Sequence, residues 1–316
     1  YDHQCGFKAF SRPAFMVLLE EMKLKNGRSW AWDTEILVRA QVHKFKIKEF
    51  PVKWREGRES KFKILSDSIR IFQYVLEFRF ELSREKKHTP IVLNHFDSIA
   101  LSYDACDLTS ERRFSIISEI VSKIVCKQQG RTTLLDLGGG TGRLWGTIMN
   151  TSGRKSIDYL LLDPSREMLR HAKARIKDLQ AILAIGEQLP LKTGTINCVT
   201  CSEVLEHVQN PERIISQAKG ILKDDGVLIV SNPNRLWTPA EVIAEKVHLK
   251  PPEGPHNYLT PWNLRRELLA NHFIIIQEKS FVHPVNPSAL DKIFSNNIAK
   301  NLALKSIIVC KKPDGV

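Results

Sequence analysis

Short apolar runs alternate with amphipathic stretches along the central and C-terminal parts of the chain. Four runs read as buried strands, and they cover residues 132–137, 158–163, 196–201 and 226–232. Segment 110–127 repeats its apolar residues at helical spacing, at Phe114, Ile117, Ile120, Val121 and Ile124. Further helices are predicted from Arg143, from Pro164–Ser165 and, with Asn210 as N-cap, from Pro211, and a last strand at 305–312. This alternation predicts an α/β fold with a parallel sheet, in which Gly226 supplies the turn into the fifth strand.

Glycines crowd the end of the first strand. Gly138, Gly139, Gly140 and Gly142 separate this strand from the helix that begins at Arg143. Glycine allows a sharp turn and lets a ligand lie against the backbone, and the N–H groups of the following helix favour an electron-rich group. A dinucleotide-binding loop would need a third glycine at Arg143, and the G-K-[ST] ending of a triphosphate-binding loop is absent. A purely structural glycine turn stays an alternative.

A carboxylate ends the second strand. Asp163 follows Gly142 by 21 residues, a position from which an acid can accept hydrogen bonds from ribose hydroxyls. Because the carboxyl ends of parallel strands meet at one edge of the sheet, we expect Asp163 beside the glycine loop. A capping or surface role for Asp163 is the alternative.

Several segments, taken in order, resemble one family. They are HFDSIALSYD (95–104), DLGGGTG (136–142), LLLDPSREML (160–169), GEQLPL (186–191), the long stretch 202–234 and HNYLTPWNLRRELLANHF (256–273). Together they resemble class I S-adenosylmethionine (SAM) methyltransferases of the type 11 family, over roughly residues 92–311. The resemblance implies a Rossmann-like, seven-stranded sheet and SAM as the cofactor.

The resemblance also implies roles for individual residues. Cofactor contacts are implied for Tyr103, Asp136, Gly138, Gly140, Gly142, Asp163, Glu187, Leu189, Ser202 and Glu203. The glycines would hold the methionine part, Asp163 the ribose, and Glu187 with Leu189 the adenine. Ser202 and Glu203 would border the methyl group, with Tyr103 above the cofactor. The chain departs from the family pattern at Ile185, where an acid is usual, and at 196–197, where Phe-Asp is usual.

Methyl transfer mainly requires that the nucleophile be held in line with the methyl group in a pocket that excludes water. A base is needed only when the nucleophile must lose a proton. His207 and His256 are the candidate bases. Packing beside the turn is the alternative role for His207. His256 lies with Tyr258 on a loop expected near the active site, where it would act in catalysis or contact the substrate.

Composition limits the other functional classes. The 316 residues, 42% of them hydrophobic, suffice for one large core and a second small unit. Six scattered cysteines without a signal peptide predict a reducing, cytoplasmic setting. Cys198 and Cys201 are spaced as a C-x-x-C motif, but positions three apart on a strand point to opposite faces, so no metal or redox site is expected.

The first 90 residues differ from the rest. They carry 19 Lys plus Arg against 12 Asp plus Glu, a net charge of +7 out of +12 for the chain. We expect a segment at 1–82, a linker at 83–91 and the methyltransferase-like domain at 92–316. Because the chain starts at Tyr1 without methionine, we also expect further residues upstream.

The N-terminal segment resembles a second family. The strings YDHQCGFKAFSRPAF (1–15), WAWDTEILVRA (30–40) and IKEFPVKWREGRESKFKI (47–64) resemble the C-terminal part of GT-A-fold, polyprenyl-phosphate-type glycosyltransferases of family 2. The resemblance implies donor and acceptor contacts at Gln4, Lys8, Asp33, Glu35, Ser60 and Lys61. The nucleotide-sugar-binding half with its D-x-D motif is absent, so this chain alone is not expected to transfer sugar.

Segment 69–87 interleaves large apolar residues with arginines and lysines. It is too charged to span a bilayer but suits the membrane surface, and a helix covering the glycosyltransferase core is the alternative. No nucleic-acid-binding motif accompanies the basic charge. The working hypothesis is SAM-dependent O-methylation of a glycan, glycolipid or other small molecule near the cytoplasmic membrane face. A non-catalytic SAM-binding module and an NAD-dependent oxidoreductase are the alternatives.

Overall fold

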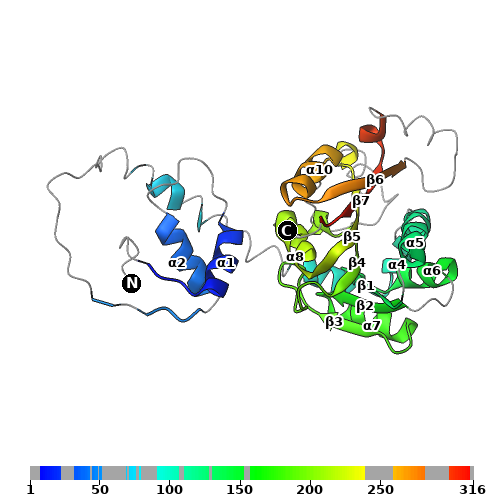
Figure 1. Cartoon of the computed structure of the whole chain (residues 1–316), viewed down its shortest axis with the longest axis horizontal. Coiled ribbons are helices and arrows are strands. Elements are labelled where there is room, and N and C mark those ends of the chain that lie inside the picture. Colours follow the sequence, from blue (N-terminus) through cyan, green and yellow to red (C-terminus); the bar gives the residue numbers. More distant parts are fainter. Residues whose placement is uncertain are drawn as a thin grey trace. The chain divides into compact units, whose positions relative to one another are not determined.

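The computed structural model describes residues 8–22, 32–42, 45–48, 50–51, 69, 71–75, 78–79, 91–106, 110–127, 130–152, 157–238, 259–281 and 299–313. The chain divides into two compact units, Tyr1–Lys87 and His88–Val316 (Figure 1). Within the described ranges, no helix is long and apolar enough to cross a membrane.

The second unit is built on one sheet of seven strands. They are β1 (Thr132–Leu137), β2 (Ile157–Asp163), β3 (Gln180–Leu183), β4 (Ile196–Ser202), β5 (Leu222–Pro233), β6 (Ile274–Phe281) and β7 (Lys305–Lys311). Their order is β3-β2-β1-β4-β5-β7-β6. The first five strands are parallel, whereas β7 runs antiparallel to both β5 and β6. The predicted Rossmann-like, seven-stranded α/β fold is therefore confirmed.

Helices cover both faces of this sheet (Figure 1). One hydrophobic cluster joins α5 (Ser110–Lys127), α6 (Arg143–Ser152) and α7 (Arg166–Arg175) to the sheet. The other joins α8 (Pro211–Ile221) and α10 (Pro261–Ala270) to the opposite face. Short helices lie at α4 (Tyr103–Cys106), η1 (Leu205–His207), η2 (Arg235–Trp237) and η3 (Ala299–Leu302).

The two cysteines of β4 point to opposite faces of the sheet, as predicted from their spacing. Cys198 belongs to the cluster under α5 and α6, and Cys201 to the cluster under α8. Burial raises the pKa of the Cys198 thiol to about 12 and that of Cys201 well above its ordinary value. Both thiols therefore stay protonated at neutral pH and serve as core residues.

Local sequence signals explain most of the element boundaries. Helix α5 has the predicted bounds, and Ser165 caps α7 because its Oγ accepts a hydrogen bond from Met168 N at 3.1 Å. Asn210 occupies the N-cap position of α8 and Pro211 lies in its first turn, as predicted, although the Asn210 side chain makes no capping hydrogen bond.

The prediction that Gly226 supplies the turn into the fifth strand was wrong. Strand β5 already begins at Leu222, which pairs with Ile196, and the next pair is Cys198 with Val227. The ladder therefore resumes after a bulge that holds the extra residues, with Asp225 at φ 64°. Pairing of Leu222 with the neighbouring strand outweighs the turn preference of glycine.

The first unit contains α1 (Arg12–Glu21) and α2 (Trp32–Val42). A small core joins them through Leu18, Met22, Ile36 and Ala40.

Polar contacts also hold the first unit together. Lys8 pairs with Asp33 at 3.4 Å, and the buried Glu35 accepts hydrogen bonds from Arg39 Nε at 3.0 Å and from the Tyr74 hydroxyl. The Arg39 guanidinium in turn lies 5.2 Å from the ring centre of Phe78. Of the residues expected near a sugar-transfer site, Lys8 and Asp33 are paired, and Glu35 lies on the same helix as Asp33 but bonds to Arg39 and Tyr74. Gln4, Ser60 and Lys61 lie outside the described residues.

Candidate functional site

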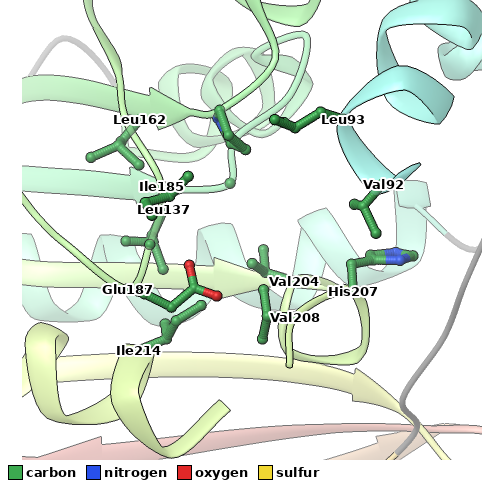
Figure 2. Close-up of a pocket in the computed structure, with 13 residues that line it drawn as sticks. Val92, Leu93, Leu137, Leu162, Ile185, Glu187, Val204, His207, Val208 and Ile214 are labelled. Carbon is green, nitrogen blue, oxygen red and sulfur yellow. The ribbon is translucent and has the colours of Figure 1, made fainter. Parts of the chain in front are cut away.

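A pocket opens at the carboxyl ends of β1, β2 and β4 (Figure 2). It is lined by Val92, Leu93, Leu137, Gly138, Leu162, Pro164, Ile185, Gly186, Glu187, Val204, His207, Val208 and Ile214. Most of these side chains are apolar, and Glu187 directs its carboxyl group into the space between them. Such a slot suits a flat, largely apolar ring with a polar edge.

The glycine loop forms one wall of this pocket. Gly138, Gly140 and Gly142 all adopt positive φ, at 70°, 53° and 75°. A Cβ at Gly138 would lie 2.4 Å from Val204 Cγ2, so only glycine fits there. At Gly140 the nearest atom to such a Cβ is Tyr103 Cε1 at 3.7 Å, so Tyr103 lies in contact distance of this glycine.

Asp163 lies at the carboxyl end of β2, beside the glycine loop, as expected. Its two carboxylate oxygens accept hydrogen bonds from Gly140 N at 2.9 Å and from Ser165 N at 2.8 Å. Burial raises its pKa to about 6 despite these bonds, and the nearby charges of Asp136 and Asp97 add to the increase. Each oxygen keeps a further lone pair with which it can accept a ligand hydroxyl.

Asp136 lies beneath the loop and is buried. It accepts hydrogen bonds from the Tyr159 hydroxyl on β2 and from Thr200 Oγ1 on β4, both at 2.7 Å. Burial nevertheless raises its pKa. Asp136 therefore ties β1 to its two neighbouring strands, and its direct contact with a cofactor stays a prediction.

Ser202 ends β4, next to β5, and Glu203 follows it directly. Glu203 adopts φ 57°, and Ser231 Oγ donates a hydrogen bond to its carboxylate at 3.0 Å. The same carboxylate pairs with Lys305 of β7 and lies 3.7 Å from Arg113 Nη1 of α5. Ser202 Oγ lies 3.1 Å from Ser231 Oγ. Glu203 is thus held in a largely buried ion cluster that the sequence motif did not indicate.

Of the remaining predicted residues, one lines the pocket, one packs against the core and one lies outside the described residues. His207 lines the pocket, and its ring packs edge-on against Phe96 with 4.9 Å between ring centres. Leu189 packs against the core and is absent from the pocket lining, while its N–H donates to Gln217 Oε1 at 3.1 Å. His256 lies outside the described residues.

Sequence reasoning missed Asp97 and Asp104, which fix the segment above the pocket. Asp97 accepts a hydrogen bond from Ser165 Oγ at 2.5 Å, and Asp104 accepts one from Thr141 Oγ1 at 2.6 Å. Both acids lie within the motif HFDSIALSYD (95–104), and Asp104 directly follows Tyr103, so the motif itself was a signal that could have identified them.

The pocket has the features that a nucleoside with an amino-acid extension requires. The half-buried backbone of Gly140 and the carboxylate of Asp163 lie beside the pocket, and the pocket itself provides an apolar slot between Ile185 and Val208. Residues 109–296, more than half of the chain, match the family described as a methyltransferase domain. The chain belongs to this family. Its cofactor is S-adenosylmethionine, and the residues around the pocket fit that molecule.

Individual relatives of this methyltransferase match parts of it. It is 44% identical over 134 residues to a ubiquinone biosynthesis O-methyltransferase of Glaesserella parasuis. The matched stretch covers 40% of the chain and 56% of that protein. It is also 42% identical over 82 residues to glycosyltransferase AglD of Haloferax volcanii, which covers 26% of the chain and 13% of AglD. The chain thus spans 56% of the length of the O-methyltransferase and 13% of the length of AglD.

One of the solved structures similar to this methyltransferase is itself a methyltransferase. A SAM-dependent methyltransferase of Thermotoga maritima, described as a possible histamine N-methyltransferase, is 22% identical to this methyltransferase. The match covers 70% of this chain and 99% of that one, with a TM-score of 0.49.

Proposed function

We propose that this methyltransferase O-methylates a hydroxyl group of a glycan, a glycolipid or another small molecule. The observation that carries the proposal is the pairing of two resemblances in one chain: a methyltransferase domain and a stretch 42% identical to a glycosyltransferase. A methyl acceptor made or carried by a sugar-transferring neighbour is the simplest substrate for such a fusion. The partial match to an O-methyltransferase supports oxygen as the acceptor atom.

We assign the cofactor contacts by the shape of the pocket. The backbone at Gly140 would hold the methionine part, with Gly138 and Gly142 shaping the loop, and Asp163 would accept a ribose hydroxyl. Glu187 would face the adenine within the apolar slot. When bound, SAM supplies a methyl group on a sulfonium sulfur. The protein then has to orient the acceptor oxygen and exclude water, at the strand end formed by Ser202 and Glu203.

Binding of S-adenosylhomocysteine should depend on pH through Asp163. A ribose hydroxyl donates to the ionised carboxylate, and the pKa of Asp163 is about 6. Affinity should be constant from pH 7 to 8 and fall toward about tenfold per unit below pH 6. Calorimetric titrations across this range measure the effect, and an Asp163→Asn variant should bind weakly without this dependence. A constant affinity down to pH 5 in the wild type would contradict the assignment.

The same pKa has the opposite consequence for folding. A carboxyl whose pKa is raised in the folded state keeps its proton at a pH where the unfolded chain has lost it. Its contribution to stability therefore decreases as the pH rises from about 4 to about 6. Cofactor binding and folding thus favour different protonation states of Asp163.

We propose His207 as the base that takes the proton from the acceptor hydroxyl. Its side chain faces the pocket, although it also packs against Phe96. His207→Asn should lower kcat by about 100-fold or more, a larger effect than any change in the affinity for S-adenosylhomocysteine. The exposed His272 provides the control, and His272→Asn should leave both quantities at the wild-type value. An unchanged kcat in His207→Asn would assign His207 a packing role.

We further propose that residues 1–82 are the end of a family 2 glycosyltransferase, joined by a linker at 83–91 to the methyltransferase at 92–316. Contact of this segment with the cytoplasmic face of a membrane would bring the enzyme to a lipid-linked acceptor. Supporting this, Ile69 and Phe72 expose 57% and 64% of their surfaces in a basic stretch of sequence. Flotation with anionic vesicles should carry the wild type, and an Ile69→Ser/Phe72→Ser variant should stay behind. Equal flotation of the wild type and the variant would contradict the proposed membrane contact.

The acceptor is tested with tritium-labelled SAM and a panel of four substrate classes. These are free glycans, polyprenyl-phosphate-linked sugars, quinone-like phenols and amines, with products identified by mass spectrometry. Methylation of a sugar hydroxyl supports the proposal. Methylation of only a phenol or an amine contradicts the glycan acceptor and leaves the methyltransferase activity intact. Cofactor binding with no S-adenosylhomocysteine formed from any acceptor would favour a non-catalytic module.

A further inference from the structure

A segment that precedes the domain's first long helix lies over the pocket. Residues 91–106, which we name the cap, comprise helical residues 91–99 and α4. Val92 and Leu93 of the cap point toward the pocket opposite Leu137 and Val204 (Figure 2). Tyr103 reaches over the glycine loop, with Cε1 3.7 Å from the position of a Cβ at Gly140. A ligand on the loop would therefore lie beneath the cap.

Aromatic rings join the two helical parts of the cap to each other and to His207 of the pocket. The ring centres of Phe96 and Tyr103 are 6.0 Å apart, and those of Phe96 and His207 are 4.9 Å apart. Both pairs are edge-on. Displacing the cap would separate Phe96 from His207 and move Tyr103 away from Gly140.

The main attachment of the cap is at Asp104. Its carboxylate accepts hydrogen bonds from Thr141 Oγ1 at 2.6 Å and from Arg175 Nη2, and its backbone oxygen accepts one from Arg143 Nη1 at 3.0 Å. Arg175 also donates to Thr141 O at 2.9 Å. One acid of the cap is thus bound to the glycine loop, to the first residue of α6 and to the last residue of α7.

These contacts keep Asp104 ionised. Burial opposes its ionisation, but hydrogen bonds from Thr141 and Arg175 and the positive charges of Arg175 and Arg143 outweigh burial and lower the pKa. The attachment therefore persists at neutral pH. Its contribution to stability is lost only as the pH falls through the lowered pKa of this carboxyl.

A second attachment is at Asp97. Its carboxylate accepts hydrogen bonds from Ser165 Oγ at 2.5 Å and, more weakly, from Glu167 N at 3.4 Å. Ser165 also caps α7 and donates its own N–H to Asp163. The cap is therefore fixed to the same turn that positions the proposed ribose-binding acid.

We propose that Asp104, assisted by Asp97, is a positioning residue that holds the cap closed over bound SAM, and that release of these contacts sets the rate of cofactor exchange. The inference rests on the cofactor site alone and is independent of the acceptor. It assigns a function to residues that do not themselves touch the reacting atoms.

The test measures dissociation of tritium-labelled SAM chased by excess unlabelled SAM from the full chain. Asp104→Asn removes the charge from an attachment that is about one-third exposed, so the rate should rise about tenfold. Hydrogen exchange of the SAM-free protein should accelerate in residues 91–106 and stay unchanged in β1 and β4. Asp158→Asn, which removes another partly exposed pair at the opposite end of β2, is the control and should behave as wild type.

Two further variants keep the test informative if Asp104→Asn does not fold. Arg175→Gln removes the same charge pair from the other partner, and Asp97→Asn weakens the second attachment. Arg175→Gln should reproduce the faster dissociation, with little further effect in the double variant with Asp104→Asn. Unchanged dissociation in all folded variants would overturn the proposal. Faster exchange spread through the whole sheet would also overturn it, since it would show general destabilisation.

Discussion

Gly140→Arg should abolish binding of SAM and S-adenosylhomocysteine, with a loss of affinity of more than about 100-fold. A Cβ at Gly140 would meet only Tyr103 Cε1 at 3.7 Å and Met168 Sδ at 4.0 Å, so a single methyl group fits there but a long side chain would have to extend past Tyr103. An arginine there would occupy the groove in which we place the methionine part of the cofactor. Its positive charge would also lie next to the cationic sulfonium. Calorimetric titration of the variant beside the wild type measures the loss.

A matched control separates this effect from backbone strain. Gly194 also has positive φ, at 66°, and has no atom within 4 Å of a Cβ, but it precedes β4 at the opposite edge of the sheet. Any residue other than glycine costs about 1–2 kcal/mol at such a position. Gly194→Arg should therefore lower the melting temperature about as much as Gly140→Arg while binding SAM normally. Loss of binding in both variants would show that strain, and not the groove, is responsible.

Leu161→Ala should destabilise the methyltransferase unit by about 2–5 kcal/mol. Leu161 is fully buried in β2 and lies under the glycine loop, where its Cγ is 2.7 Å from the position of a Cβ at Gly139. The cavity would therefore open directly beneath the loop. We expect a fall in melting temperature of about 10 °C and several-fold weaker cofactor binding.

Leu183→Ala provides the comparison, because Leu183 lies on the neighbouring strand β3 with 50% of its surface exposed. Its truncation should change the unfolding free energy by less than about 0.5 kcal/mol. Equal losses in the two variants would show that Leu161 does not support the loop as described.

The sequence predicted the fold because local pattern and tertiary position agree over most of the second unit. The apolar runs at 132–137 and 158–163 became β1 and β2, which are buried between two layers of helices. The glycine loop and Asp163 were also predictable, because strand order brings the carboxyl ends of these two strands together. Periodicity carries no information about a bulge, which explains the error at Gly226.

The connections within the site could not be predicted in the same way. Glu203 and Lys305 are 102 residues apart, and only the insertion of β7 beside β5 brings them together. Asp136 precedes the glycines, but its place in the motif did not indicate the hydrogen bonds that it accepts from Tyr159 and Thr200 inside the sheet. Which way a side chain turns at a strand end depends on partners from distant strands.

The place of β7 in the sheet has a consequence for synthesis of the protein. Strand β6 pairs with β7 alone, and β7 separates it from β5. During translation β6 leaves the ribosome first but lacks its native partner until residues 305–311 have emerged. Until then β5 presents an unpaired edge that carries Leu228 and Val230, which become buried in the finished sheet. A nascent chain stalled before residue 305 would thus offer chaperones and proteases two open edges that the completed domain conceals.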